Sequence, residues 1–237
     1  MCHLSRLQII FILVSSIFCV ENIDAQLYRS NQNFQEFQSK PYYFGITLGT
    51  TNSRYKVFQG QNFIIGDSLV VAEGLRAPGF DVHVIGNLKI GDYFDFRFLP
   101  GFSFAERPLE FVTSSGPTFT RNIESVFFEA PFLVRYKSAP YKDKRAFVVA
   151  GLKYSFDVAN NSATREAESL IQISPHDFQF EIGAGMQFFF PYFIFSPEVK
   201  FSQGIGNILI FNSELEEVSI LEKILSRVFT LSFHFEG

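Results

Sequence analysis

The stretch FTLSFHFE, at residues 229–236, alternates between apolar and polar side chains without a break. Its apolar members are Phe229, Leu231, Phe233 and Phe235, and its polar members are Thr230, Ser232, His234 and Glu236. Because successive side chains of a β-strand point to opposite faces, this stretch predicts a strand with one apolar and one polar face. Such strands occur both in soluble sandwiches and in barrels that cross a membrane.

The same alternation recurs along the chain and predicts eight strands. They cover residues 42–51, 79–90, 93–105, 123–137, 145–159, 177–190, 192–203 and 227–236. In the segment 177–190, for example, Phe178 and Ile182 share one parity, whereas Gln179 and Glu181 share the other. A slip of one residue would move every charge to the apolar face, so the register of each strand is strongly specified.

The connections between these segments alternate between long and short. The long ones are residues 52–78, 106–122, 160–176 and 204–226, and the short ones are 91–92, 138–144 and 191–192. Outer-membrane barrels have short periplasmic turns, longer extracellular loops and an even number of strands. We therefore predict an all-β protein, an eight-stranded antiparallel up-and-down transmembrane β-barrel with both ends of the barrel chain in the periplasm. A secreted sandwich or lipocalin-like barrel is the alternative, but it predicts neither this asymmetry nor a Phe-rich face.

The composition narrows the class of protein further. Hydrophobic residues make up 47% of the 237 residues, yet no run of 18 apolar residues follows the N-terminal region. This excludes a bundle of membrane helices and fits a barrel, in which apolar residues are spread one in two. The chain has 32 Phe and no Trp, so Phe has to take over much of the lipid-facing and interfacial role that Trp often shares. The net charge of −4 and the absence of a basic cluster exclude nucleic acid as an expected partner.

Residues 1–25 are predicted to be a signal peptide. Arg6 supplies the positive charge, residues 7–20 the apolar stretch, and Ala25 a small residue at the cleavage site. Both cysteines, Cys2 and Cys19, fall inside this segment, so the mature chain is expected to form no disulfide. A lipid anchor on Cys19 is a weaker alternative, because the bulky residue Phe18 precedes it.

A polar periplasmic lead is expected at residues 26–40, followed by the outer-membrane barrel domain at 41–237. The lead is rich in Gln and Asn and carries four isolated hydrophobic residues, Leu27, Tyr28, Phe34 and Phe37. It is either a spacer left by signal cleavage or a docking segment for other proteins. In the last long loop, Ser213 and Glu216 fit a capping box, and apolar residues then follow at near-helical spacing to Leu225. This predicts a short amphipathic helix over residues 213–226 on the extracellular side, which either covers the barrel mouth or docks a protein.

Charged side chains on the polar faces are expected to point into the barrel. They are Asp81, His83, Lys89, Asp95, Arg97, Glu129, Arg135, Lys137, Arg145, Lys153, Asp157, Glu181, Glu198, Lys200 and Glu236. An eight-stranded barrel has room inside only for side chains, and buried charges are tolerated only when paired. We therefore predict a structural ion-pair network of Arg97, Glu129, Lys153, Glu181, Glu198 and Lys200. An ion or substrate path is the alternative.

The sequence offers little support for catalysis. His83, His176 and His234 are the candidate bases of the mature chain, and none accompanies a recognisable nucleophile motif. Metal-ligand spacings, glycine-rich phosphate loops and calcium loops are absent from the sequence. No catalytic, cofactor-binding or metal-binding residue is therefore expected, although some small barrels modify lipids.

Over residues 41–236 the chain resembles the PorT family, also called SprT, of outer-membrane proteins of the type IX secretion system. The resemblance rests on YYFGITLG (42–49), FAER (104–107), IES (123–125), YKS (136–138), GLKYS (151–155), SPEVKFS (196–202) and LSFHFE (231–236), taken in this order and spacing. It implies a non-enzymatic barrel that is required to export proteins with a C-terminal secretion signal, and for gliding where the bacterium glides. Its partners would be other type IX components and outer-membrane lipid. A general small barrel with a structural or ligand-binding role is the alternative. Unlike many barrels, the chain ends on Gly237 rather than on an aromatic residue.

Overall fold

The computed structural model describes residues 32–59, 69–113, 118–121, 124–158, 173–210 and 221–237, all within one unit of the chain. A short helix, α2 (Gln32–Gln38), is followed only by strands. These are β1 (Tyr42–Gln59), β2 (Leu69–Gly74), β3 (Ala77–Ile90), β4 (Phe94–Phe98), β5 (Gly101–Glu106), β6 (Leu109–Thr113), β7 (Thr118–Arg121), β8 (Glu124–Lys137), β9 (Lys144–Asp157), β10 (His176–Phe189), β11 (Ile194–Gly204) and β12 (Leu221–Glu236). In this part of the chain no helix is long and apolar enough to span a membrane.

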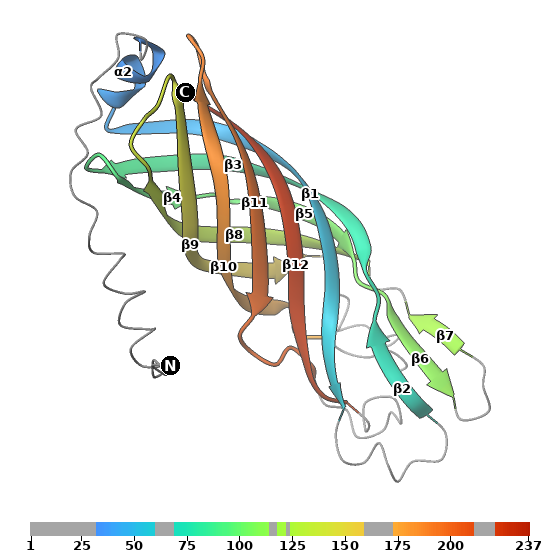
Figure 1. Cartoon of the computed structure of the whole chain (residues 1–237). Coiled ribbons are helices and arrows are strands. Elements are labelled where there is room, and N and C mark those ends of the chain that lie inside the picture. The colour runs from blue at the N-terminus through green and yellow to red at the C-terminus, as the bar shows by residue number, and fades with distance from the viewer. Residues whose placement is uncertain (1–31, 60–68, 114–117, 122–123, 159–172, 211–220) are drawn as a thin grey trace, which may run out of the picture. The chain divides into compact units, whose positions relative to one another are not determined.

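All of these strands except β2, β6 and β7 close into an antiparallel ring (Figure 1). Around the ring the order is β1, β12, β11, β10, β9, β8, then β4 with β5, then β3, which pairs again with β1. Both β4 and β5 pair with β3 on one side and β8 on the other, so together they occupy one position in the wall. The predicted eight-stranded antiparallel barrel is therefore confirmed.

Two residues, Leu99 and Pro100, separate β4 from β5 because proline has no N–H to donate to the ladder. Two of their backbone groups still pair with the neighbouring strands: Leu99 N donates to Pro131 O at 3.1 Å, and Val84 N donates to Pro100 O at 2.9 Å. The wall is also tight beside them, since a Cβ on Gly101 would lie 2.6 Å from the Cα of His83. Glycine permits this close approach of two strands.

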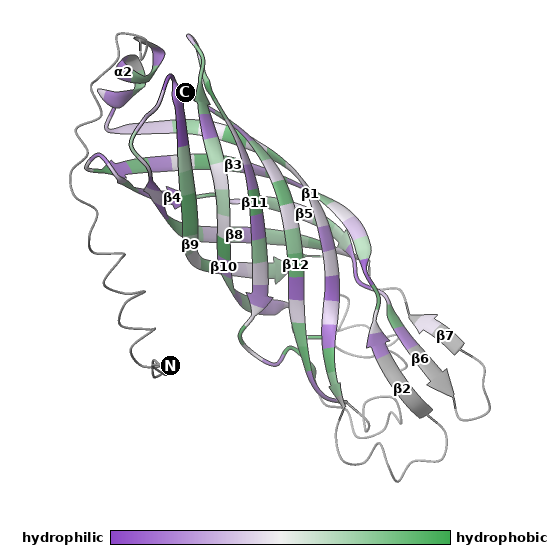
Figure 2. Cartoon of the chain, in the orientation of Figure 1, coloured by the Kyte–Doolittle hydropathy of each residue, from purple (hydrophilic) through white to green (hydrophobic). Residues whose placement is uncertain are grey.

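The two faces of the wall differ as the alternation predicts. On β10, Phe178 is 61% and Ile182 52% exposed on the outside, whereas Gln179 and Glu181 between them are buried inside. Figure 2 shows apolar and polar residues alternating along the strands. Aromatic rings pair across neighbouring strands on the outer face, as in Phe80 with Phe104 and Phe98 with Phe132, with centroids 4.6 Å apart in each pair. An exposed apolar wall of this kind faces lipid.

Two strands extend well beyond their predicted ends. β1 continues to Gln59 and β12 begins at Leu221, and the added residues pair with each other from Tyr55↔Ser226 to Gln59↔Leu221. Residues 221–226, predicted as the last part of a helix, are therefore strand. The preceding part of that helix, 213–220, lies outside the described residues. The sequence of these six residues is compatible with both a helix and a strand. Pairing with β1 favours the strand, because it provides the ladder hydrogen bonds.

The long connections also contain a second sheet that was expected to be loop. β2 lies between β1 and β3, whereas β6 and β7 lie between β5 and β8, and they pair in the order β2, β6, β7. Their four to six residues each are too few to show a clear alternation in the sequence. Two of the long connections thus form a sheet of their own.

Candidate functional site

The six residues predicted to form a network lie together inside the barrel. Arg97 Nη1 is 3.1 Å from Glu198 Oε2, and Lys153 Nζ is 3.0 Å from Glu129 Oε1 and 3.4 Å from Glu181 Oε1. Lys200 Nζ is 3.8 Å from Glu181 and 3.9 Å from Glu198, which makes ion pairs too long for hydrogen bonds. The six side chains thus form one chain of alternating charge, running Glu129, Lys153, Glu181, Lys200, Glu198, Arg97.

This chain of charges extends toward the end of the barrel with the short turns. Arg97 Nη2 is 2.6 Å from Glu236 Oε1, and Arg135 Nη1 is 3.4 Å from the same oxygen. Arg135 Nη2 is 2.8 Å from Asp95 Oδ2, and Lys137 forms an ion pair with the other oxygen of that carboxylate. Side chains from β4, β8, β11 and β12 are thereby linked across the interior, which the alternation of any single strand cannot show.

The interior also holds an apolar layer that the sequence did not predict. Its members are Ile85, Leu99, Leu133, Phe147 and Val149, all buried. These residues occupy inward-facing positions of the wall, where the alternation leads one to expect polar side chains. Together with the fully buried guanidinium groups of Arg97 and Arg135, they fill the cross-section with side chains.

A lumen filled in this way is expected to carry no ion current. Purified barrel inserted into a planar lipid bilayer should give no stepwise conductance above the empty bilayer, whereas a wide porin in the same bilayer should. Reproducible current steps that scale with the amount of inserted barrel would contradict a packed lumen.

One buried histidine, His234, has neighbours like those in a hydrolytic triad, but a substrate cannot reach it. Nδ1 of His234 lies 2.7 Å from Thr47 Oγ1, and its Nε2 lies 3.4 Å from Glu198 Oε2. All three side chains are at most 1% exposed, so no substrate could reach them. His83 lies 3.5 Å from Glu129 and 3.7 Å from Asp81, again in the interior. Both histidines lie against carboxylates of the ion-pair network.

The remaining candidate base, His176, was expected at the end of a long connection and is instead the first residue of β10. It faces outward, where its Nδ1 lies 2.7 Å from Tyr154 Oη and its ring lies beside Phe156. This is an aromatic cluster on the outer wall. Within the described ranges no group of three or more His, Cys, Asp or Glu could hold a metal ion.

Part of the predicted polar lead forms α2, which lies across the short-turn end of the barrel, the end that also holds the C-terminus (Figure 1). Phe34 and Phe37, three residues apart, point from one side of this helix toward the wall. Both are buried and form a cluster with Phe189, the last residue of β10, and Ile194, the first residue of β11. The Phe34 and Phe189 rings meet edge to face with centroids 5.1 Å apart.

Charged side chains of the barrel meet both ends of α2. The backbone N of Phe34 donates to Asp143 Oδ1 at 3.1 Å, and Lys89 Nζ donates to the carbonyl of Phe37. A helix leaves unpaired N–H groups at its start and unpaired carbonyls at its end, with the matching partial charges. Asp143 and Lys89 therefore have the signs that complement the helix at the ends they contact.

Asp143 reaches α2 from an unusual turn. It follows Lys142, and both residues have positive φ values, 46° for Lys142 and 52° for Asp143. Tyr141 and Lys144 exchange both backbone hydrogen bonds across them, which closes a two-residue hairpin. Such turns favour glycine or asparagine, so Lys142 and Asp143 are held in a sparsely populated backbone region.

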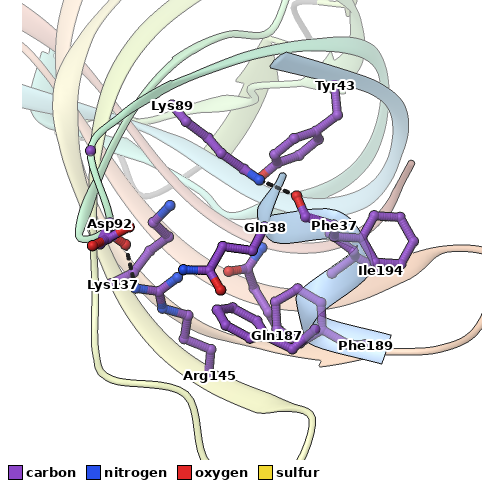
Figure 3. Close-up of a pocket in the computed structure, with 12 residues that line it drawn as sticks. Phe37, Gln38, Tyr43, Lys89, Asp92, Lys137, Arg145, Gln187, Phe189 and Ile194 are labelled. Carbon is purple, nitrogen blue, oxygen red and sulfur yellow. Dashed lines mark hydrogen bonds between the residues drawn. The ribbon is translucent and has the colours of Figure 1, made fainter. Parts of the chain in front are cut away.

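Between α2 and the strand ends lies a small hollow, drawn in Figure 3. Three cationic side chains line it, Lys89, Lys137 and Arg145, together with Asp92 and the amides of Gln38 and Gln187. The Arg145 guanidinium donates to the carbonyl of Asp92 and lies 5.6 Å from the ring centroid of Phe34. The hollow is thus roofed by α2 and has a positively charged floor.

The fold and the filled lumen define the chain as a small barrel of the outer-membrane type. Residues 25–209 match the family model described as outer membrane protein beta-barrel domain, and the chain belongs to this family. It is an integral protein of the bacterial outer membrane, and its short turns accordingly face the periplasm. No curated protein matches the chain.

Solved structures of other outer-membrane proteins are similar at low identity. OprG of Pseudomonas aeruginosa is 9% identical, with a TM-score of 0.49 over 83% of this chain and 95% of that chain. Neisserial surface protein A is 10% identical, with a TM-score of 0.40 over 81% and 96% of the two chains. Ail of Yersinia pestis is 12% identical, with a TM-score of 0.36 over 84% and 100%.

Proposed function

We propose that this barrel is a non-enzymatic component of the type IX protein secretion system, needed to export proteins that carry a C-terminal secretion signal. The resemblance to the PorT family supports the pathway. The filled lumen supports the mode of action, because a barrel packed with Arg97, Arg135 and Leu133 has no room to pass a protein or a solute. Its role in export is then to contact other proteins, and it needs no cofactor or metal.

The periplasmic mouth is the surface that fits this role best. Its partners are other type IX components in the periplasm or the outer membrane, and the outer wall is embedded in outer-membrane lipid. The observation that carries this choice is α2, because Asp143 and Lys89 hold it across the mouth although the ring of strands closes without it.

Deletion of the gene tests the proposal. Cargo with a C-terminal secretion signal should accumulate in the periplasm with that signal uncleaved, and gliding should stop in a gliding bacterium. Expression of the full chain from a plasmid should restore export. Export at the normal rate in the deletion strain would refute the proposal.

A general barrel with a structural or surface-binding role is the second candidate. The sheet of β2, β6 and β7 favours it, because extracellular connections that form a sheet offer an ordered surface for a ligand. Replacing residues 109–121 by a short Gly-Ser linker distinguishes the two candidates. Altered adhesion of whole cells, together with normal export in the deletion strain, would favour the second candidate. Unchanged adhesion and export in this variant, together with lost export in the deletion strain, would favour the first. A lipid-modifying enzyme is the least supported reading, because its best histidine, His234, is fully buried.

A further inference from the structure

We propose that the surface beneath α2 is a binding site for short amphipathic helices, which α2 occupies within its own chain and which a helix of a periplasmic protein occupies by displacing α2. This surface, the helix seat, consists of Lys89, Asp143, Arg145, Phe189 and Ile194. The matching partner helix carries two aromatic residues three positions apart, as Phe34 and Phe37 do in α2. That the partner belongs to a secretion system rests on the proposed function, whereas the binding of helices does not.

The helix seat recognises features that any such helix presents. Asp143 accepts a backbone N–H near the start of α2, and Lys89 donates to a backbone carbonyl near its end. Phe189 and Ile194 receive the two aromatic side chains, and Arg145 lies on the ring of Phe34. Among the α2 side chains that the structure describes, Asn33 hydrogen-bonds to the seat, with its Nδ2 donating to Phe189 O at 3.2 Å. Backbone ends and two rings therefore define the ligand, and another helix can supply both.

The helix seat is fixed by the barrel and not by α2. Lys89 and Arg145 lie within β3 and β9, and Phe189 and Ile194 end and begin adjacent strands. Asp143 is held in its left-handed turn by the hydrogen bonds between Tyr141 and Lys144. Backbone conformations of this kind persist only where the surroundings impose them, and they concentrate at binding sites. Here the turn presents a carboxylate to a helix.

α2, in contrast, can detach from the helix seat while the barrel stays folded. Its seven residues are too few for a helix that is stable alone in water, so it depends on the seat. The first ring strand begins only at Tyr42, and Lys89 N is already bonded to Pro41 O, so α2 can lift at residues 39–40 without breaking the barrel ladder. Its tether gives it a high effective concentration at the seat, so a partner must bind tightly or be held nearby to compete.

A labelled peptide tests the site on purified protein. The probe is residues 31–40 with an N-terminal fluorophore, and its binding is followed by fluorescence polarisation in detergent micelles. It should bind mature barrel that lacks residues 26–38, and should bind the intact mature barrel at least about tenfold more weakly because α2 competes. The intact barrel with Phe34→Ala and Phe37→Ala should bind the probe like the truncated one, which covers the case in which truncation impairs folding.

Matched variants define the contacts. Changing both Phe residues of the probe to Ala should abolish its binding, and empty micelles should take up neither peptide. In the barrel, Lys89→Gln and Asp143→Asn should each weaken binding about two- to fivefold, the usual effect of one charge at a helix end. Lys142→Gln is the control, because this exposed neighbour contacts Tyr141 and has no contact with α2 among the described interactions.

Three results would overturn the proposal: no binding to either barrel with a vacated seat, equal binding of the Ala peptide, or equal binding to the intact barrel. These outcomes are independent of export in the deletion strain. Binding of the probe together with normal export would leave the helix seat standing and remove the proposed function. Trapped cargo without probe binding would leave the proposed function standing and remove the helix seat.

Discussion

Arg97→Ala is expected to lower the free energy of unfolding by about 3–5 kcal/mol, the usual cost of removing one partner of a buried ion pair. Arg97 is fully buried and is the cation between Glu198 and Glu236, with nitrogens 3.1 and 2.6 Å from their oxygens. Without it, two carboxylates share a site that water does not reach. Glu236 still pairs with Arg135 at 3.4 Å, whereas Glu198 keeps only the longer ion pair with Lys200, at 3.9 Å, and the contact with His234.

The measurement is guanidinium unfolding of the refolded barrel in detergent. The chain has no Trp, so heat-modifiable migration on gels and circular dichroism are the suitable probes. Lys153→Ala and Glu198→Ala should be destabilising to a similar degree. Lys144→Ala is the matched control, because this lysine is exposed at the start of β9 and should change stability by less than about 0.5 kcal/mol. If all three network variants unfold like the parent, the network does not stabilise the barrel.

The ring of strands was predictable from the sequence because both of its determinants are local. Alternation with a period of two sets the face of each residue, and the short turns after Ile90, Lys137 and Phe189 set which strands are neighbours. The inward position of Arg97 and Glu198 follows from the same parity. Their pairing does not, because Arg97 lies on β4 and Glu198 on β11, which are not neighbours in the ring. Contacts across a lumen depend on the barrel's closure and shear, which no single strand encodes.

The periplasmic mouth was beyond prediction for a different reason. Phe34 and Phe37 stand out in a polar segment, yet seven residues carry too weak a pattern to indicate a helix. What stabilises α2 is supplied from elsewhere, by Lys89 in β3, Asp143 after β8 and Phe189 in β10. Residues 221–226 were wrongly predicted to be helical. Their apolar residues have helical spacing, but pairing with β1 makes them part of a strand. Tertiary contacts decided both cases.

On the outer wall, Ile182→Arg is expected to destabilise the barrel in lipid bilayers by about 2–4 kcal/mol, the cost of a cation at the membrane midplane. Ile182 lies in the middle of β10, is 52% exposed, and pairs with Ala150 on one side and Phe201 on the other. Folding into vesicles should be followed by gel mobility across a denaturant series. The same substitution should cost less in detergent micelles, where the head group can reach water more easily.

The control places the same charge near the membrane surface. Val158 is 56% exposed just beyond the end of β9, so Val158→Arg should cost only about 0–1 kcal/mol. The contrast between the two positions isolates depth in the membrane, because both substitutions add one arginine to an exposed apolar site. A soluble barrel would tolerate arginine equally at both. Equal stability of the two variants in vesicles would therefore contradict the lipid-facing assignment of the Phe-rich wall, whereas a larger loss at Ile182 requires that the middle of β10 lie in hydrocarbon.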